Sequence, residues 1–313
     1  MKPILRVECL TVRVGAIDAV HAVTFELDKG QRVGLIGESG SGKTLTALAI
    51  MGLLPEGLSA SGRVLFQAQD LLALSEQQLC RVRGDRLAMI FQEPMTALNP
   101  VQPVGYQVAE PLRLHRRLGK LDALTEANRL LARVHMPDPA DRARAYPHQL
   151  SGGQRQRAMI AMAVACSPDL LVADEPTTAL DVTVQAQILN LLGELVEEGG
   201  ATLLLITHDL PVVSTVCERV LVMYGGHLVE EGATATVFTR PRHPYTRALL
   251  DAIPPWEGEE RKLPTIAGSV PGLGQFPPGC PFRNRCPRAD DVCREMPPLA
   301  GDGQRVACWH PLA

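Results

Sequence analysis

A glycine-rich segment near the start of the chain has the residue pattern of a phosphate-binding loop. It fits G-x-x-x-x-G-K-[ST], in which glycines let the backbone wrap around phosphate groups and point its N–H groups at them. We expect the ammonium of Lys43 to reach the β- and γ-phosphates of a nucleotide and the hydroxyl of Thr44 to bind Mg²⁺. The alternative is a glycine-rich turn without a ligand. The predicted phosphate-binding residues are Gly37, Glu38, Ser39, Gly40, Ser41, Gly42, Lys43 and Thr44.

An acidic pair follows an apolar run in the middle of the chain. Asp174 and Glu175 come directly after residues 170–173, which are Leu, Leu, Val and Ala. Taken alone, such a pair is most often the cap of a helix. Together with a phosphate loop, it predicts that Asp174 binds Mg²⁺, usually through water. Glu175 is then placed to polarise the water that attacks the γ-phosphate.

Four of the eight cysteines crowd the last part of the chain with the spacing C-x5-C-x6-C-x14-C. Because disulfides are rare in the cytosol, where we expect this chain, the crowding indicates a metal site. Four thiolates suit either Zn²⁺ or a [4Fe–4S] cluster, and spacings wider than those of zinc knuckles suit the cluster. Zinc and unliganded buried thiols are the alternatives. The four candidate ligands are Cys280, Cys286, Cys293 and Cys308, and the four predicted small buried cysteines are Cys9, Cys80, Cys166 and Cys217.

The composition is that of an ordinary globular protein with an aliphatic core. Hydrophobic residues make up 46% and aromatic residues 4% of the 313 residues, and the formal net charge is −3. A near-neutral chain is not built as a general polyanion binder, so we expect no nucleic-acid partner. No apolar run approaches the roughly 20 residues of a membrane-spanning helix. The first 14 residues contain Arg6, Glu8 and Arg13 and so lack the apolar core of a signal peptide.

The elements that must position these residues follow from the apolar pattern. Residues 33–36 are predicted to form a strand that leads into the phosphate loop, with a helix over 45–51 behind it. Residues 170–173 and 203–206 are further continuous apolar runs, each preceded by a helical stretch. Such runs are typical of strands buried on both faces, so the sequence predicts an α/β fold with a mostly parallel sheet.

Two segments depart from that pattern. Residues 5–26 are rich in Val and Thr and are predicted to form short antiparallel strands. Residues 102–166 contain no convincing strand and are predicted to form helices inserted between two parts of the sheet. Near Arg240 the composition shifts towards Pro, and the Pro-rich tail is too poor in apolar residues to build a core of its own. We therefore predict two domains, 1–238 and 239–313, with a helical insert at about 95–160.

The pentapeptide Leu150-Ser151-Gly152-Gly153-Gln154, together with the two motifs above, resembles the signature of ATP-binding cassette (ABC) ATPases. The resemblance covers roughly residues 3–235 and implies a P-loop NTPase fold that binds ATP and Mg²⁺. Gln92 resembles the Q-loop glutamine, which would also contact Mg²⁺, and His208 resembles the switch histidine. The resemblance further implies residues that contact ATP on a partner ATPase, namely Ser151, Gly152, Gly153, Gln154 and, in the D-loop Ala179-Leu180-Asp181, Asp181.

One departure from the family pattern concerns the nucleotide base. Such cassettes often place an aromatic residue that stacks on adenine in the first strands, whereas residues 11–15 offer none. Arg13 or Val14 would cover the base instead. The departure concerns base selectivity and leaves the phosphate chemistry unaffected.

The second half of the chain narrows the resemblance. Residues 241–250 are similar to the region after the cassette in oligopeptide, dipeptide and nickel importer ATPases, and the cysteine tail resembles the di/oligopeptide branch. That likeness favours a [4Fe–4S] cluster over Zn²⁺ and peptides over nickel. It implies a motor ATPase at the cytoplasmic side of the cell membrane, with a second ATPase subunit (usually a paralogue), two transmembrane permease subunits and an extracytoplasmic peptide-binding protein. The alternatives are an importer for another substrate such as nickel, a free-standing exporter ATPase, and a soluble ABC protein outside transport.

Overall fold

The computed structural model describes residues 2–178, 180–253 and 266–313, which have an α/β architecture with a mixed sheet. Two compact units are present, each made of three segments of the chain, and the last passage from one unit to the other falls within strand β8 (Thr202–Ile206). The first unit comprises Met1–Ile4, Asp28–Gln31 and Ala73–Leu204; the second comprises Leu5–Leu27, Arg32–Leu72 and Leu205–Ala313. This division does not test the domain boundary at residue 238, which stays a prediction.

The first unit contains the buried strands β6 (Leu87–Ile90), β7 (Leu170–Asp174) and the start of β8. β6 and β7 are parallel, with Leu87 opposite Leu170. Every residue of β6 and β7 is buried. Because both faces of these strands are covered, their sequences show no alternation, and the strand predicted over 170–173 is confirmed.

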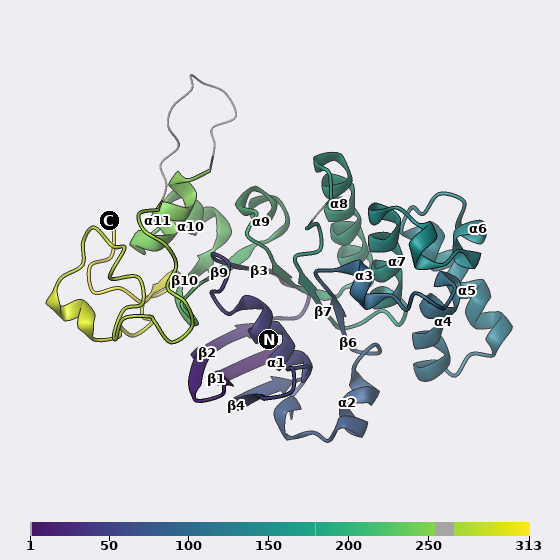
Figure 1. Cartoon of the computed structure of the whole chain (residues 1–313), viewed down its shortest axis with the longest axis horizontal. Helices are drawn as coiled ribbons and strands as arrows, with labels where there is room; N and C mark the ends of the chain where they lie inside the picture. Colours follow the sequence, from purple (N-terminus) through teal and green to yellow (C-terminus); the bar gives the residue numbers. More distant parts are fainter. Residues whose placement is uncertain (1, 179, 254–265) are drawn as a thin grey trace. The chain divides into compact units, whose positions relative to one another are not determined.

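The helical segment of the first unit connects β6 to β7 in the sequence and lies to one side of both strands (Figure 1). It consists of α3 (Pro94–Ala97), α4 (Val104–His115), α5 (Lys120–Arg133), α6 (Pro139–Arg144) and α7 (Gly152–Val164). A Cβ added to Gly105 would lie 2.9 Å from the carbonyl oxygen of Ala143, so α4 and α6 approach closely. The predicted all-helical character of residues 102–166 is confirmed. The unit also holds α2 (Glu76–Val82) and α8 (Val182–Gly199).

The second unit contains an antiparallel sheet of strand order β2-β1-β4-β5 (Figure 1). Its members are β1 (Leu5–Val14), β2 (Ile17–Leu27), β4 (Leu58–Phe66) and β5 (Gln69–Asp70). The antiparallel strands predicted over residues 5–26 are confirmed.

The second unit also holds β3 (Arg32–Ile36), which is parallel to β9 (Arg219–Tyr224). β10 (His227–Ala233) pairs antiparallel with β9, and β11 (Arg305–Val306) pairs antiparallel with β10. The helices of this unit are α1 (Lys43–Met51), α9 (Leu210–Val216), α10 (Thr234–Thr239) and α11 (Pro244–Asp251).

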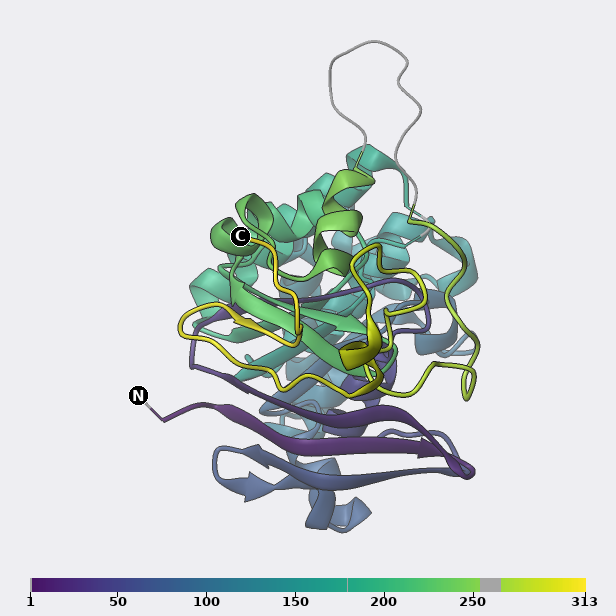
Figure 2. The same ribbon diagram turned by 90° about the vertical axis from the view of Figure 1, so that its left-hand side faces the viewer.

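The C-terminal tail is mostly irregular and runs along β10 (Figure 2). β11 covers the edge of β10, with Val306 opposite Glu230. The buried carboxylate of Glu230 accepts from the backbone N–H groups of Arg242 at 2.7 Å and His243 at 3.0 Å, and from Nε2 of Gln304 at 2.7 Å. The tail therefore supplies part of the polar environment that a buried carboxylate requires.

Aromatic side chains join the tail to the rest of the second unit. The ring of Phe282 lies 5.3 Å from both Tyr224 and Tyr245, and Phe276 packs edge-on against Tyr224 at 5.9 Å. Tyr224, Tyr245 and Phe282 are almost fully buried. The tail lacks enough apolar residues for its own core, as predicted, and instead completes the core of the unit.

The remaining cysteines divide into two pairs. Cys166 and Cys217 are buried as predicted, and burial raises the pKa of Cys217 to about 12. Cys9 and Cys80 are exposed, so the prediction that these two are buried is wrong. Both lie on elements with one solvent-facing side, which their apolar neighbours in the sequence do not reveal. Among the described residues, no helix combines the length and the apolar character needed to span a bilayer.

Candidate nucleotide site and cysteine cavity

β3 leads directly into the predicted phosphate loop, whose glycines adopt backbone conformations that other residues avoid. Gly37, Gly40 and Gly42 have φ angles of +152°, +79° and +98°. A Cβ added to Gly37 would lie 2.1 Å from the carbonyl oxygen of Met223, so no side chain fits there. The loop conformation therefore depends on the glycines at these positions.

Lys43 lies in the first turn of α1 and is only 6% exposed. Its Nζ donates to the carbonyl oxygens of Gly37 at 2.8 Å and Glu38 at 3.1 Å, and to Oγ of Ser41 at 3.5 Å. These contacts hold a desolvated ammonium at the start of a nine-residue helix, where the helix dipole also favours anions. Thr44, the predicted Mg²⁺ ligand, follows it and is exposed.

The acidic pair lies at the end of β7 in the first unit. Asp174 is 2% exposed, whereas Glu175 is half-buried and has a φ angle of +45°. A positive φ is uncommon outside glycine and indicates local strain that the surroundings must hold. Oε2 of Glu175 accepts a hydrogen bond of 2.8 Å from Oγ1 of Thr178. Both backbone and side chain of Glu175 are thus held in a defined orientation.

The predicted signature segment starts α7 in the same unit. Ser151 is the N-cap: its Oγ accepts from the N–H of Gln154 at 3.3 Å, and Oε1 of Gln154 accepts from the N–H of Ser151 at 3.0 Å. Gly152 is exposed and Gly153 half-buried. A Cβ on Gly153 would lie 2.9 Å from Cγ1 of Val184, so α7 packs closely on α8.

Asp181 and Gln92 are exposed residues of the first unit. Asp181 is the N-cap of α8, where its Oδ1 accepts from the N–H of Val184 at 3.0 Å. Since Gly153 packs on that same Val184, the starts of α7 and α8 lie side by side. Ala179, which precedes Asp181 in the predicted D-loop, lies outside the described residues. Gln92 follows β6.

His208 belongs to the second unit and follows β8. It is exposed, whereas its neighbour Thr207 is buried. Asp209 caps α9 by accepting from the N–H of Val212 at 3.2 Å. The second unit therefore holds His208 and the phosphate loop, and the first unit holds the other predicted nucleotide-site residues.

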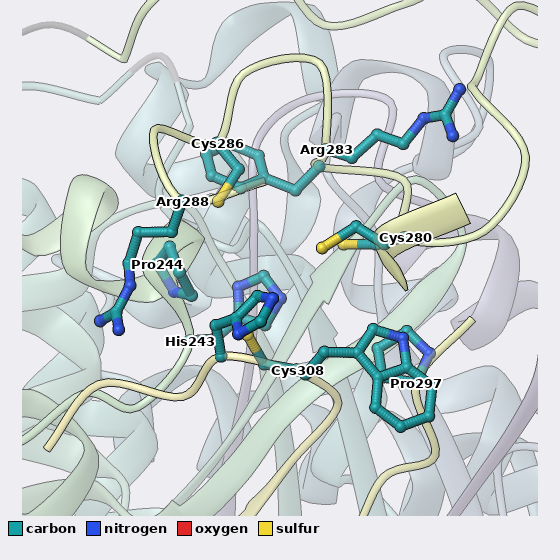
Figure 3. Close-up of a pocket in the computed structure, with 12 residues that line it drawn as sticks. His243, Pro244, Cys280, Arg283, Cys286, Arg288, Pro297 and Cys308 are labelled. Carbon is teal, nitrogen blue, oxygen red and sulfur yellow. The ribbon is translucent and has the colours of Figure 1, made fainter. Parts of the chain in front are cut away.

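The four cysteines of the tail line one cavity of the second unit (Figure 3). Cys280 and Cys293 are buried and the other two are half-buried. Burial is the main cause that raises the pKa of the Cys280 thiol to about 11; the backbone of Phe282 opposes this shift, and the neighbouring Cys293, Cys308 and Cys286 add to it. Because thiolates gathered here repel one another, the deprotonated set requires positive charge in the cavity.

His243 lines the same cavity and is 1% exposed (Figure 3). Its Nδ1 accepts a hydrogen bond of 3.0 Å from the N–H of Tyr245, so the ring proton resides on Nε2. Nε2 is buried without a hydrogen-bond partner among the described residues. Burial lowers the pKa of His243 to about 3, with a small opposing effect of the Ala307 backbone. His243 is thus a neutral imidazole that carries its proton on Nε2.

Three other side chains form a second group of candidate ligands. The ligand atoms of Asp290, Cys293 and His310 lie within 4.8 Å of one another, and no other such group occurs in the described part of the chain. Nε2 of His310 lies 2.9 Å from Oδ2 of Asp290, and Sγ of Cys293 donates to Oδ1 of the same carboxylate at 3.6 Å. These groups satisfy one another without an ion.

Comparison with known proteins identifies two regions of the chain. Residues 20–178 match the family model described as "ABC transporter", and residues 229–293 match "Oligopeptide/dipeptide transporter, C-terminal region". A probable peptide ABC transporter ATP-binding protein of Sinorhizobium fredii is 50% identical over 298 residues, which are 93% of this chain and 89% of that protein. The chain belongs to the ABC transporter ATP-binding family. As an ABC-type ATPase it uses ATP and Mg²⁺.

Other relatives of this ABC ATPase match over most of their length. The oligopeptide transport ATP-binding protein OppD of Salmonella typhimurium is 47% identical over 95% of this chain and 90% of its own. The dipeptide transport ATP-binding protein DppD of Bacillus subtilis is 46% identical over 99% of this chain and 95% of its own.

Solved structures agree with this membership. The dimeric post-hydrolysis state of the ATP-binding cassette MJ0796 bound to ADP and Pi matches with a TM-score of 0.66 and 29% identity, over 74% of this chain and 98% of that one. The structure of cbiO1 from Clostridium perfringens, part of the ABC transporter complex cbiONQ, matches with a TM-score of 0.65 and 27% identity, over 76% and 92%. The predicted cassette fold is confirmed.

Three residues at these sites were missed in the sequence. Arg285 and Tyr245 contact Glu38 of the phosphate loop, and His243 faces the cysteines. Tyr245 and His243 lie in the segment 241–250, whose sequence resembles the peptide importer branch. That resemblance indicates the family but does not show that these two side chains contact the phosphate loop or the cysteines. Arg285 lies between two of the predicted cysteine ligands, and nothing in its spacing relates it to residue 38.

Proposed function

We propose that this ABC ATPase is the motor subunit of an importer for di- or oligopeptides. The observation that carries the proposal is the C-terminal region: residues 229–293 match the oligopeptide/dipeptide transporter model, and relatives with peptide-transport names extend over this region at 46–50% identity. In this role the chain works at the cytoplasmic face of the membrane. It does so with two permease subunits and an extracytoplasmic peptide-binding protein.

In the proposed mechanism, residues 37–44 bind the phosphates of ATP. The N–H groups of the glycine-rich loop and the ammonium of Lys43 bind the β- and γ-phosphates, for which Lys43 exchanges carbonyl partners for phosphate oxygens. Thr44 and Asp174 would hold Mg²⁺, together with Gln92. The ion would supply charge neutralisation at the phosphates.

Glu175 polarises the water that attacks the γ-phosphate. Its hydrogen bond from Thr178 and its strained backbone fix the direction of the side chain. His208 and Gln92 contact the γ-phosphate region and report its presence. Loss of the γ-phosphate then releases these contacts.

A second ATPase subunit, which we propose to be a paralogue, completes each ATP site. Ser151, Gly152, Gly153 and Gln154 present the N-terminus of α7 to ATP held by the partner, and Asp181 lies at the neighbouring start of α8. The contact between Gly153 and Val184 supports this proposal, because it makes the two helix starts one continuous surface.

The helical insert transmits closure to a permease subunit. Exposed apolar side chains at its start support a docking surface there: Val101 is 78% and Tyr106 40% exposed. Single cysteines at these two positions should cross-link to a cytoplasmic segment of a permease, whereas one at the exposed Arg129 of α5 should not. Absence of any cross-link from 101 and 106 in every nucleotide state would contradict the docking role.

We further propose that Cys280, Cys286, Cys293 and Cys308, which line one cavity, hold a [4Fe–4S] cluster. A tetrahedral zinc with Zn–S of about 2.3 Å would bring its sulfurs within about 4 Å of one another, yet no three of the four described thiols lie within 4.8 Å. The wider spacing suits a cluster. The Nε2–H of His243, which lines the same cavity, would donate to a sulfur, and the cluster would supply positive charge and folding energy.

Metal analysis after anaerobic purification tests this assignment. We expect visible absorption with about four iron and four sulfide per chain. A colourless protein with one zinc and no sulfide would contradict the cluster and point to Cys293 with Asp290 and His310. His243→Gln should shift the reduction potential of the cluster, while an unchanged potential would assign its N–H to the Ala307 carbonyl instead.

Reconstitution tests the transport function. The complex with its permeases in vesicles should hydrolyse ATP faster when the binding protein carries a peptide than when it is empty. The Glu175→Gln complex is the matched control. If nickel but not peptides stimulated hydrolysis, the proposed peptide substrate would be wrong, whereas the assignment as an ATPase would stand.

A further inference from the structure

An acidic side chain in a phosphate loop can weaken nucleotide binding by electrostatic repulsion. Glu38 is the second residue of residues 37–44, and its carbonyl oxygen accepts from Nζ of Lys43. Its carboxylate would repel the phosphates of ATP if it were free to turn towards them, because two charges a few ångströms apart interact strongly near a poorly solvated surface. The way in which the chain holds this side chain therefore bears on ATP affinity.

Arg285 of the C-terminal tail holds the Glu38 carboxylate with both arms of its guanidinium. Nη1 donates to Oε2 at 2.7 Å and Nη2 donates to Oε1 at 3.2 Å. The Arg285 side chain is 6% exposed and that of Glu38 24%, so the pair is largely shielded from water. Such a two-armed pair fixes both the position and the charge of the carboxylate.

Further contacts fix Arg285 itself. Its Nε donates to the carbonyl oxygen of Ala267 at 2.8 Å, and Nη1 also donates to Oη of Tyr224 at 3.2 Å. The guanidinium lies 5.8 Å from the ring centres of Tyr224 and Phe282. All three nitrogens thus have partners, which favours one orientation of the side chain.

A second contact fixes the backbone of the same loop residue. The N–H of Glu38 donates to Oη of Tyr245 at 2.7 Å, and Tyr245 is fully buried at the start of α11. Glu38 is therefore held at its N–H by Tyr245 and at its carboxylate by Arg285.

We propose that Arg285 is a positioning residue for ATP binding, because it neutralises Glu38 and keeps its carboxylate away from the phosphates. Arg285 lies in the turn that connects Cys280 to Cys286, where its N–H donates to the carbonyl of Phe282 at 2.9 Å. The conformation of the four-cysteine segment therefore determines whether Arg285 can pair with Glu38 and neutralise its charge in the phosphate loop. The inference rests on the proposal that residues 37–44 bind ATP.

Affinity for Mg·AMP-PNP, a non-hydrolysable analogue, tests the proposal in the full-length chain. Arg285→Gln should weaken binding about tenfold, since an unpaired carboxylate remains beside the phosphates. Arg285→Gln combined with Glu38→Gln should recover most of the loss because neither charge remains. A double variant as weak as the single one would overturn the electrostatic role and leave only a structural one.

Ionic strength and a conservative variant supply two further readouts. The defect of Arg285→Gln should shrink as salt rises from roughly 50 mM to 500 mM, because repulsion is screened. Arg285→Lys keeps the charge and should bind the analogue more tightly than Arg285→Gln; if the Gln variant does not fold, Lys is compared with the double variant. A defect that does not depend on salt, or equal affinity of the Lys and Gln variants, would contradict the proposal.

Coupling to the cysteine segment is measured in two backgrounds. Cys293→Ser should weaken analogue binding in the wild-type chain and have little further effect in the double variant, in which the Arg285–Glu38 pair is already absent. Equal loss in both backgrounds would overturn the coupling. Lys43→Ala distinguishes failure of this inference from failure of the proposed ATP site. If Lys43→Ala binds the analogue as tightly as the wild type, residues 37–44 are not the ATP site. If Lys43→Ala binds it more weakly but Arg285→Gln does not, only the role of Arg285 is contradicted.

Discussion

The phosphate loop and the cysteine cavity belong to the same unit but are built in opposite ways. The loop consists of eight consecutive residues, fixed by glycine conformations and by hydrogen bonds among its own atoms. The cavity gathers four thiols from residues 280–308, which contain one short 3₁₀ turn (Asp291–Arg294) and one short strand. The loop is fixed by its own backbone, whereas the thiols come from separate turns and would need a positively charged ligand only if they lost their protons. Substitutions in the hydrolytic residues, in the phosphate loop and in the cysteine cavity should therefore affect different measured properties.

The largest effect is expected where neither region is touched. Glu175→Gln should lower ATP turnover by about 100- to 10,000-fold, because the amide cannot act as a base. ATP affinity and metal content should stay at wild-type values. The test is steady-state hydrolysis in the assembled complex, with both ATPase subunits substituted in turn. Turnover close to normal when both carry the change would remove Glu175 from its role.

Two substitutions among the proposed nucleotide-site residues should affect different properties, one the affinity for ATP and the other the rate of hydrolysis. Lys43→Ala should weaken ATP binding by roughly 10- to 100-fold through the loss of charge-assisted hydrogen bonds. His208→Ala should spare binding and slow hydrolysis, since this exposed side chain acts on the γ-phosphate of bound ATP. Nucleotide titration and turnover are measured for both variants. Equal loss of affinity would contradict the division.

In the cavity, the expected effect is on metal content and stability. Cys293→Ser should lose most of the bound metal and lower the free energy of unfolding by roughly 1–3 kcal/mol, because ligand binding stabilises the folded chain. Cys80→Ser is the matched control, since Cys80 is exposed and lies outside the cavity. Thermal unfolding and metal analysis of both variants provide the comparison. Full metal content in Cys293→Ser would show that this thiol is not a ligand.

The last prediction, which leaves activity at neutral pH unchanged, is a dependence of stability on pH beside the loop. His227 stacks on His21 at 4.3 Å, next to Gly226, whose N–H donates to the carbonyl of Ser41. Burial, and to a lesser degree His21, lowers the pKa of His227 to about 4. The folded state therefore resists a proton that the unfolded state accepts near pH 6.5, and stability falls as pH drops from 6.5 towards 4.

The size of this pH effect is on the order of 1 kcal/mol per pH unit. His227→Gln should flatten the dependence measured by denaturant unfolding, whereas His148→Gln, at an exposed position of the first unit, should leave it unchanged. Identical slopes in the wild type and in His227→Gln would show that the pair does not contribute.

The contiguous features were predictable because each motif carries its own physical explanation. Residues 37–44 require glycine conformations and lead into helix α1, which begins at Lys43. The continuous apolar runs likewise indicated buried strands. Local sequence was therefore sufficient to predict the phosphate loop and the buried strands.

The contacts of the tail were not predictable for the converse reason. Arg285 and Glu38 are 247 positions apart, and no periodicity relates them. The tail lies far in sequence from every phosphate motif, yet the fold brings it to the loop. Cys9 and Cys80 were misjudged because apolar neighbours indicate a buried element but not which face a given side chain occupies.

Strand β11 has a consequence for how the chain can be cut or fused. A cassette ended near residue 253 would expose the backbone edge of β10 and leave Glu230 without Gln304, so the shortened protein would present a template for pairing between chains. Expression of such a fragment should give aggregates rather than a minimal motor. Exchange of tails between relatives should carry residues 229–313 as one piece.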